Sequence, residues 1–309
     1  MEAVLLLSLP ITHEDVLDAA RQIRGVTIRT PVVPWGDVRL KAENRQLTGS
    51  FKIRGAYNAV SRLSDEQLSH GVIAISSGNH AQAVAKAAQL MATTAVVAMP
   101  SDSSAYKRSA TEALGAEIVE FDRFARDRED VLRELLADTK RTFIPPYDHP
   151  HVMAGQGTAA LELIEETGEL DVLVVPVSGG GLISGCGTIA KHLCPDLRLV
   201  GVEPEAANDT KLSLDAGERI WIEAPRTIAD GLRTQIPGEL TFEVNRRLVD
   251  ELVLVSDDEI REAMAFLRDE LDEVVEPSGA VGVAALRSER VDVSTKRVGV
   301  ILSGGNVSD

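Results

Sequence analysis

Residues 171–192, DVLVVPVSGGGLISGCGTIAKH, carry the clearest signal of the fold class. The valine-rich run at 171–177 predicts a buried strand, SGGG at 178–181 a turn, and the following residues a helix to about His192. A glycine-rich turn at a helix start exposes backbone N–H groups that can hold an anion. Ser184 stands at the third glycine position of a dinucleotide fingerprint, and no P-loop Gly-Lys-Ser/Thr follows. The turn therefore suits a monophosphate, with a plain tight turn as the alternative.

The same alternation of apolar strand, polar turn and helix recurs along the chain. Further strands are expected at 72–75, 94–99, 116–121, 197–202 and 297–302, and further helices at about 81–90, 105–114 and 127–139. Such alternation indicates an α/β fold with parallel sheets covered on both faces. We expect a small domain at 69–145 and a larger one built from 1–68 and 146–309. Ligands in such folds lie where the carboxyl ends of strands open into loops.

Composition excludes several classes of protein. The 309 residues are 44% hydrophobic and have a formal net charge of −16, from 48 acidic and 32 basic residues. Nucleic-acid and anionic-membrane partners are not expected, because both require a basic surface. Cys186 and Cys194 lie outside any CxxC pattern and are expected to be buried, reduced thiols. The apolar run at 4–10 is too short to span a membrane and lacks a basic region before it, so we expect a cytoplasmic protein without a targeting segment.

The segment GSFKIRG at 49–55 contains a lysine between two apolar residues, Phe51 and Ile53. A pocket formed there would desolvate the ammonium of Lys52, lower its pKa and free the amine to form a Schiff base. The alternative is a surface lysine at the start of a helix.

Two other loops have weaker signals. SSGNH at 76–80 lies between a predicted strand and a helix, where hydroxyl, amide and N–H groups suit a carboxylate. An ordinary helix N-cap explains the same residues, and His80 alone would be structural. Glu203 and Asp209 follow another strand and could hold Mg²⁺ or Ca²⁺, or form a solvated acidic loop.

Together, and in this order, seven motifs resemble the threonine dehydratase and serine racemase group of fold-type II pyridoxal-phosphate enzymes, the tryptophan synthase β-like fold. They are GSFKIRGA (49–56), SSGNHAQA (76–83), AGQGT (154–158), SGGGL (178–182), ADGL (229–232), EPSGA (276–280) and LSGGN (302–306). The resemblance runs from about Arg29 to the C-terminus. It implies two lobes, each with a mostly parallel sheet flanked by helices, and pyridoxal 5'-phosphate as cofactor.

The resemblance also implies a role for each matching residue. Lys52 takes the Schiff-base position and Phe51 packs on the cofactor ring. The other implied cofactor-binding residues are Asn79 at the ring hydroxyl, Gly179, Gly180, Gly181 and Leu182 at the phosphate, Ser303 at the pyridine nitrogen, and Glu276. The implied substrate-binding residues are Ser76, Ser77, Asn79 and His80. Glu203, the carbonyl of Ala207, and Asp209 match a divalent-cation site for Mg²⁺, or Ca²⁺ or Mn²⁺.

The activity implied is removal of water from an L-serine- or L-threonine-type 3-hydroxy amino acid, giving a 2-keto acid and ammonia, with Lys52 as the base. Ser77 resembles the racemase and 3-hydroxyaspartate dehydratase branch, where its hydroxyl is a second acid/base. Serine racemase and 3-hydroxyaspartate dehydratase activities therefore stay open. A 3-hydroxyaspartate enzyme needs a cation for the second carboxylate, and Arg128 and Arg233 are candidates unless they are ordinary surface arginines. A homodimer is usual in this group.

The chain departs from the pattern in a shortened stretch between Trp35 and Lys41, which could alter the approach to the site or a subunit contact. It ends at Asp309, so no regulatory domain is expected. Ile53, Arg54 and the run 80–82 disfavour a β-replacement enzyme such as cysteine synthase. The missing dinucleotide fingerprint disfavours an oxidoreductase. A noncatalytic cofactor-binding protein remains as an alternative of another class.

Overall fold

The computed structural model describes residues 9–123, 125–126, 128–137, 139–294 and 296–307. The expectation for the apolar run at 4–10 therefore falls mainly outside the described residues, as do positions 127 and 138 of the helix expected at 127–139. No helix in the described ranges is both long and apolar enough to cross a membrane.

The larger sheet has six strands and gathers segments that are far apart in the sequence. In spatial order the strands are β1 (Val32–Trp35), β2 (Val38–Ala42), β10 (Val298–Leu302), β7 (Val172–Pro176), β8 (Arg198–Pro204) and β9 (Glu251–Val255). All neighbours are parallel except β1 and β2, which pair antiparallel with Trp35 opposite Val38. Gly36 supplies the positive φ of 55° that this tight connection needs. The shortened stretch after Trp35 is thus an edge hairpin.

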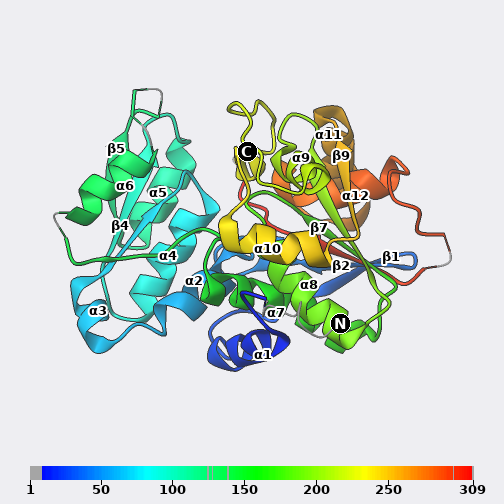
Figure 1. The fold of residues 1–309 in the computed structure, drawn as a ribbon, viewed down its shortest axis with the longest axis horizontal. Coiled ribbons are helices and arrows are strands. Elements are labelled where there is room, and N and C mark those ends of the chain that lie inside the picture. The colour runs from blue at the N-terminus through cyan, green and yellow to red at the C-terminus, as the bar shows by residue number, and fades with distance from the viewer. Residues whose placement is uncertain (1–8, 124, 127, 138, 295, 308–309) are drawn as a thin grey trace.

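The smaller sheet has four parallel strands. Their order is β5 (Glu117–Phe121), β4 (Ala95–Pro100), β3 (Val72–Ile75) and β6 (Thr142–Phe143). The strands expected from sequence in both sheets are confirmed to within two residues at each end. The two sheets lie side by side in Figure 1, the smaller on the left. These observations confirm the predicted α/β fold class, whereas the domain boundaries at 68/69 and 145/146 stay a prediction.

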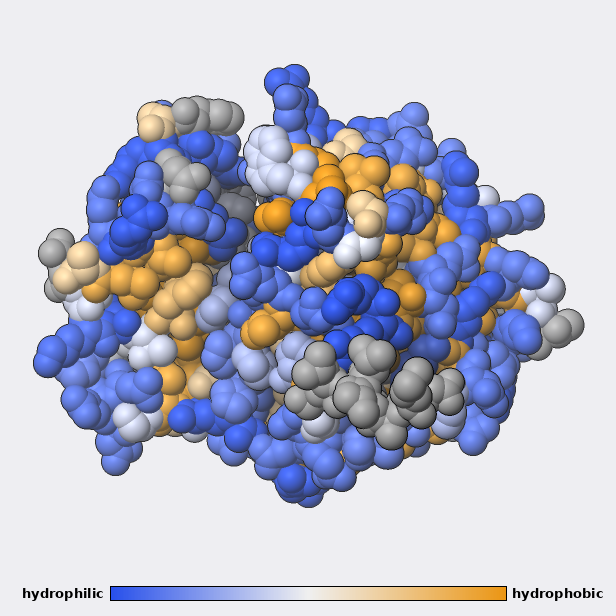
Figure 2. Space-filling view, viewed as in Figure 1, coloured by the Kyte–Doolittle hydropathy of each residue, from blue (hydrophilic) through white to orange (hydrophobic). Residues whose placement is uncertain are grey.

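Helices flank both sheets (Figure 1). They are α1 (His13–Gln22), α2 (Lys52–Val60), α3 (Asp65–His70), α4 (Asn79–Leu90), α5 (Ala105–Ala113), α6 (Arg128–Ala137), α7 (Pro150–Thr167), α8 (Gly181–Leu193), α9 (Asp209–Ala216), α10 (Glu239–Leu248), α11 (Asp257–Leu271) and α12 (Pro277–Arg287), with 3-10 turns η1 (Glu43–Arg45) and η2 (Asp230–Leu232). Hydrophilic residues cover most of the periphery of the face in Figure 2. The acidic excess of the composition fits such a surface.

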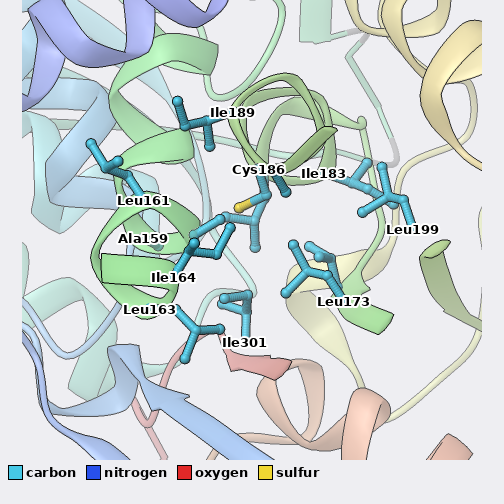
Figure 3. Packing of buried hydrophobic residues seen from close by; sticks show 14 of the residues in the cluster. Ala159, Leu161, Leu163, Ile164, Leu173, Ile183, Cys186, Ile189, Leu199 and Ile301 are labelled. Atoms are coloured by element: carbon cyan, nitrogen blue, oxygen red, sulfur yellow. The ribbon is translucent and has the colours of Figure 1, made fainter. Parts of the chain in front are cut away.

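Strand β7 shows why the larger sheet must be covered twice. Leu173 and Val175 pack with α1, α7 and α8, and Figure 3 shows Leu173 beside Ile183 and Cys186 of α8. Val172 and Val174 pack on the opposite face with α11 and α12. Successive side chains of a strand point to opposite faces, and each fully buried aliphatic side chain contributes about 1.5–3 kcal/mol.

The smaller sheet follows the same rule. Val72 and Ala74 of β3 pack with α2 and α4, whereas Ile75 packs with Val131 of α6 on the other face. Helix α2 belongs to this core and also carries Lys52 at its first turn. The packing of the smaller sheet therefore contributes to the position of Lys52.

Candidate active site

Lys52 is the first residue of α2, and its loop is fixed against the end of β10. The Phe51 N–H donates to the Ser303 carbonyl at 3.1 Å, and Ser50 forms a β-bridge with Gly304. The Lys52 Nζ lies 4.9 Å from the centroid of the Phe51 ring and donates to the Pro146 carbonyl at 2.9 Å. Two predicted cofactor residues, Phe51 and Ser303, are therefore next to the lysine.

Burial lowers the pKa of Lys52 to about 8. The charge of Glu276 opposes this shift and the charge of Arg128 adds to it. At pH 7 a group with this pKa is uncharged in about one molecule in ten, whereas an exposed lysine almost never is. The amine can therefore act as a nucleophile or a base near neutral pH.

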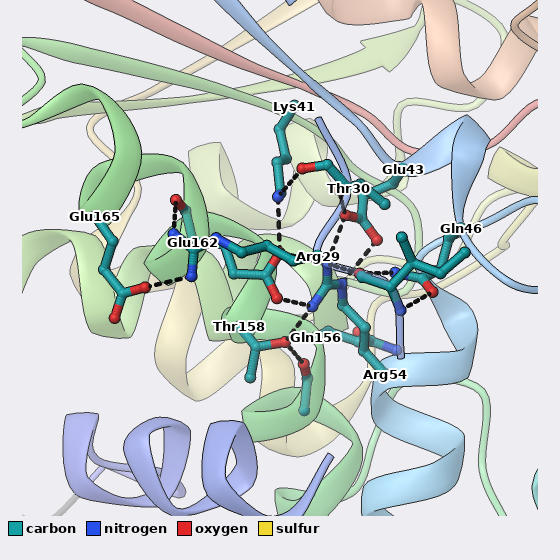
Figure 4. A network of polar contacts seen from close by, with 12 residues as sticks. Arg29, Thr30, Lys41, Glu43, Gln46, Arg54, Gln156, Thr158, Glu162 and Glu165 are labelled. Atoms are coloured by element: carbon teal, nitrogen blue, oxygen red, sulfur yellow. Dashed lines mark hydrogen bonds and ion pairs between the residues drawn. The ribbon is translucent and has the colours of Figure 1, made fainter. Parts of the chain in front are cut away.

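A buried ionic network holds the base of α2 (Figure 4). Arg54 is 0% exposed and donates to both carboxylate oxygens of Glu43, at 2.7 and 2.8 Å, and to Glu162 at 2.8 Å. Lys41 of β2 donates to the same Glu162 at 2.7 Å. The network ties α2 to β2, η1 and α7 two residues from Lys52, so it fixes the backbone that carries the amine.

Asn79 and Glu276 lie together although 197 residues separate them. Asn79 is the first residue of α4, and its Nδ2 donates to Glu276 Oε1 at 2.5 Å. Asn306 donates to Asn79 Oδ1 at 2.9 Å. The second Glu276 oxygen is buried without a hydrogen-bond partner among the described residues. Burial raises the pKa of Glu276 to about 7.

The SGGG turn joins β7 to α8, and its three glycines have no room for side chains. A Cβ on Gly179 would lie 2.4 Å from ring atoms of Tyr147, and a Cβ on Gly181 would lie 2.7 Å from Gln156 Oε1. Gly180 has a φ of +92°, which glycine adopts without strain. Leu182 follows in the first turn of α8 and is buried. The turn thus presents bare backbone at a helix N-terminus, which is the geometry of an anion site.

Ser303 directly follows β10 and lies beside the 276–280 motif. Its Oγ donates to the Ser278 carbonyl at 3.4 Å, and Ser278 Oγ accepts from the Gly231 N–H at 2.9 Å. The motifs LSGGN, EPSGA and ADGL therefore meet in space.

The SSGNH loop connects β3 to α4. Ser76 Oγ accepts from the Gly78 N–H at 3.2 Å, and the half-buried Ser77 side chain has no recorded hydrogen bond in the described ranges. His80 is buried, its Nε2 lies 2.8 Å from the Ile144 carbonyl, and its Nδ1 has no partner in the described part of the chain. Burial, with the nearby Lys52 charge, lowers the pKa of His80 to about 3. His80 is therefore neutral and offers a hydrogen bond rather than a charge.

The predicted metal ligands are close together but only partly free. Glu203 accepts the backbone N–H groups of Thr210 and Lys211 at 3.2 and 2.9 Å, so it caps α9. Asp209 Oδ2 is buried without a hydrogen-bond partner among the described residues. Ala207, two residues earlier in the chain, is also buried. Burial raises the pKa of both carboxyl groups, that of Asp209 to about 7. No group of three His, Cys, Asp or Glu side chains suited to a metal occurs in the described ranges. The donor set fits a hard cation only if main-chain carbonyls and water complete it.

The two candidate arginines differ in position. Arg233 donates through both Nε and Nη2 to the Thr227 carbonyl, so its guanidinium is already engaged. Arg128 donates to the Ile75 carbonyl at 3.0 Å, directly before the SSGNH loop, and its charge lowers the pKa of Lys52 and His80. Arg128 is therefore near the site.

Sequence reasoning did not select the segment 146–148. Pro146 accepts the Lys52 hydrogen bond, and Tyr147 covers the glycine turn. Asp148 accepts the Leu240 and Thr241 N–H groups of α10 at 2.9 and 3.1 Å. The only signal for segment 146–148 in the sequence is that it lies shortly before the AGQGT motif.

The residues present fit pyridoxal phosphate. The site combines a desolvated amine, a bare glycine turn at a helix start, and buried oxygens of Glu276 and Gln156 that have no hydrogen-bond partner in the described part of the chain. A model of the family described as "Pyridoxal-phosphate dependent enzyme" matches residues 23–304. The chain belongs to the pyridoxal-phosphate-dependent enzyme family. The resemblance predicted from the ordered motifs is confirmed.

Relatives of this pyridoxal-phosphate-dependent enzyme include lyases and racemases. It is 47% identical over 304 residues to L-threo-3-hydroxyaspartate ammonia-lyase of Saccharomyces cerevisiae, covering 96% of this chain and 93% of that protein. It is 43% identical to serine racemase of Schizosaccharomyces pombe, covering 96% and 94%. Among solved structures, maize serine racemase superposes with a TM-score of 0.93 at 38% identity, covering 97% of this chain and 94% of that chain.

Proposed function

We propose that this enzyme is a dehydratase (ammonia-lyase) that eliminates water from L-serine- or L-threonine-type 3-hydroxy amino acids, giving a 2-keto acid and ammonia. The observation that carries the proposal is the half-buried amine of Lys52 beside Phe51 and Ser303. Relatives named as L-threo-3-hydroxyaspartate ammonia-lyase, serine racemase and L-threonine ammonia-lyase support this class of reaction.

The cofactor would be held by residues from both sheets. The N–H groups of Gly179, Gly180, Gly181 and Leu182 would receive its phosphate, Phe51 would pack on its ring, Asn79 with Glu276 would face the ring hydroxyl, and Ser303 would face the ring nitrogen. When bound, pyridoxal phosphate supplies an aldehyde that captures the substrate amine and a ring that withdraws electrons from the substrate Cα.

Lys52 has the proton-transfer role in this proposal. Its amine, once released from the cofactor, is uncharged often enough to accept the proton of the substrate Cα. The Pro146 carbonyl and the Phe51 ring orient Nζ.

The loop 76–80 would hold the substrate carboxylate. The N-terminus of α4 has a favourable dipole for an anion, and the hydroxyls of Ser76 and Ser77 would donate to it together with the first backbone N–H groups of the helix, those of Asn79 and His80. The Ser77 hydroxyl makes no hydrogen bond within the described ranges, so it is available for a second proton transfer. Racemisation of serine would accompany elimination on this basis, and Ser77→Ala should abolish D-serine formation while elimination continues.

The proposal includes an optional divalent cation, Mg²⁺ or Ca²⁺ or Mn²⁺, at Glu203, Asp209 and the Ala207 carbonyl. The unpartnered Asp209 Oδ2 supports it. A homodimer and a cytoplasmic location stay predictions. The two-part division at 68/69 and 145/146 is also kept as a proposal.

One screen tests the function. Ammonia and 2-keto acid release should be measured on L-serine, D-serine, L-threonine and the 3-hydroxyaspartate stereoisomers, with and without Mg²⁺. We expect release from at least one L-3-hydroxy amino acid, and Lys52→Ala should lose it. Cofactor absorbance without release from any substrate would favour the noncatalytic alternative.

A further inference from the structure

Lys107 connects α5, beside the smaller sheet, with the 3-10 turn η2, beside the larger sheet, at the edge of the proposed site. It lies on α5, beside the smaller sheet, and its Nζ forms an ion pair with Asp230 of η2, which packs with the larger sheet. The Lys107 side chain is 12% exposed and that of Asp230 is 38% exposed. The ammonium is therefore largely shielded from water, whereas its partner can be solvated if the pair separates.

One close approach places this ammonium beside the substrate loop, and its partner Asp230 lies next to a residue that contacts the 276–280 motif. A Cβ on Gly78 would lie 3.3 Å from the Lys107 Nζ, so the side chain runs along the SSGNH turn. The charge of Lys107 counteracts the rise in the Glu276 pKa. Gly231, next to Asp230, donates to Ser278 Oγ, and Ser303 donates to the Ser278 carbonyl.

A positive charge at this place has a chemical consequence for substrate choice. The loop 76–80 is proposed to hold the α-carboxylate, and 3-hydroxyaspartate has a second carboxylate two carbons away. A carboxylate can replace Asp230 as the partner of a shielded ammonium, and charge-assisted hydrogen bonds are among the strongest in proteins. A serine or threonine side chain has no group that could do so.

We propose that Lys107 is a specificity-determining residue that accepts the second carboxylate of a dicarboxylic 3-hydroxy amino acid, with Asp230 as its partner in the absence of such a substrate. This inference rests on the proposed function, because it names the substrate class that the same site favours. The two residues of the ion pair are expected to have opposite effects on the preference for a dicarboxylic substrate. Lys107 favours the dicarboxylic substrate, whereas Asp230 competes with it.

The test compares kcat/KM for L-threo-3-hydroxyaspartate and L-serine in the holoenzyme. The specificity ratio is kcat/KM for L-threo-3-hydroxyaspartate divided by kcat/KM for L-serine. Lys107→Met should lower this ratio by about 10–100-fold, as loss of a charged hydrogen-bond partner does. Lys107→Arg should retain most of the ratio. The matched control is Lys86→Met, which removes the same charge from α4, where Lys86 contacts Gln89; this change should leave the ratio as it is.

Asp230→Asn supplies the second arm. It removes the competing carboxylate, so the ratio should rise, in the direction opposite to Lys107→Met. If both variants lower kcat/KM for both substrates by the same factor, the pair is only a contact between the two parts of the fold, and the inference is wrong. A ratio that neither variant changes would overturn it as well.

A binding measurement separates this inference from the proposed function. Succinate has both carboxylates and no leaving group, and its binding can be followed by the change in cofactor absorbance. Tighter binding to the wild type than to Lys107→Met supports the carboxylate site even if no substrate releases ammonia. Equal binding to both proteins contradicts it even if elimination is observed.

Discussion

The Lys52 Nζ lies 2.9 Å from the carbonyl oxygen of Pro146, and the next residue, Tyr147, covers Gly179 of the glycine turn. A single short segment therefore touches both the reactive amine and the proposed phosphate site. Residues 146 and 147 therefore link these two parts of the site. This relationship explains how an amine on α2 can serve a group anchored at α8.

The pKa of Lys52 predicts the pH dependence of cofactor attachment. Attack on the aldehyde needs the uncharged amine, so the attachment rate of the apoprotein should rise with pH and reach half its plateau near the pKa of about 8. Stopped-flow absorbance of apoprotein mixed with pyridoxal phosphate measures it. A blocked lysine in solution is the control, with a midpoint near its ordinary pKa of about 10.4. A protein midpoint equal to that of the control would show that burial does not activate Lys52.

Gly179→Ala should weaken cofactor binding. The new methyl group would overlap the Tyr147 ring, and overpacking of about 1–3 kcal/mol lowers affinity by about tenfold or more. Equilibrium dialysis of pyridoxal phosphate gives the affinity. Gly168→Ala is a control for general destabilisation: its methyl group would have nothing within 4 Å, but the φ of +79° strains the backbone there, so stability should fall while the affinity stays unchanged. Unchanged affinity in Gly179→Ala would remove the glycine turn from the site.

Arg54→Met should destabilise the fold by about 3–5 kcal/mol, because it leaves the buried Glu43 without its ion-pair partner and Glu162 paired with Lys41 alone. Urea denaturation measures the loss. Adding Glu43→Gln to Arg54→Met should recover part of it, since one stranded charge is removed. Arg268→Met removes an exposed arginine paired with Asp269 and should change the stability little. Equal effects of the two arginine variants would contradict the structural role of the network in Figure 4.

The proposed cation site predicts a thermal shift. Millimolar Mg²⁺ should raise the Tm of the wild type by roughly 2–4 °C, because a ligand that binds only the folded state stabilises it. Asp209→Asn should lose this shift, because Oδ2 of Asp209 is a buried acceptor without a hydrogen-bond partner among the residues that the structure describes. Differential scanning calorimetry with Mg²⁺, Ca²⁺ and Na⁺ tests the point. A Tm that responds to Na⁺ as strongly as to Mg²⁺ would mean general screening rather than a site.

Much of the fold could be predicted from the sequence because the buried strands are continuous apolar runs. Val72–Ile75 was predicted with its observed bounds, since a parallel strand covered on both faces has no polar positions. The helix expected from residue 81 begins two residues earlier, at Asn79. Its N-cap is Gly78, which has no side chain to form a capping hydrogen bond, so the sequence contains no cap signal for this start.

The missed site residues depend on contacts between distant segments. Tyr147 reaches Gly179, and Lys107 reaches Asp230 across 123 residues. No local pattern marks either residue, because an aromatic in a loop and a lysine on a helix surface are common. Glu203 shows the opposite case: its motif suggested a metal ligand, but the fold also uses its carboxylate to cap α9.

The most direct test of the central claim is chemical. The holoenzyme should be treated with borohydride, digested and mapped by mass spectrometry. We predict that the reduced pyridoxyl group is attached to Lys52 and that Lys52→Ala gives no adduct at that site. An adduct on another lysine, with Lys52 unmodified, would contradict the account.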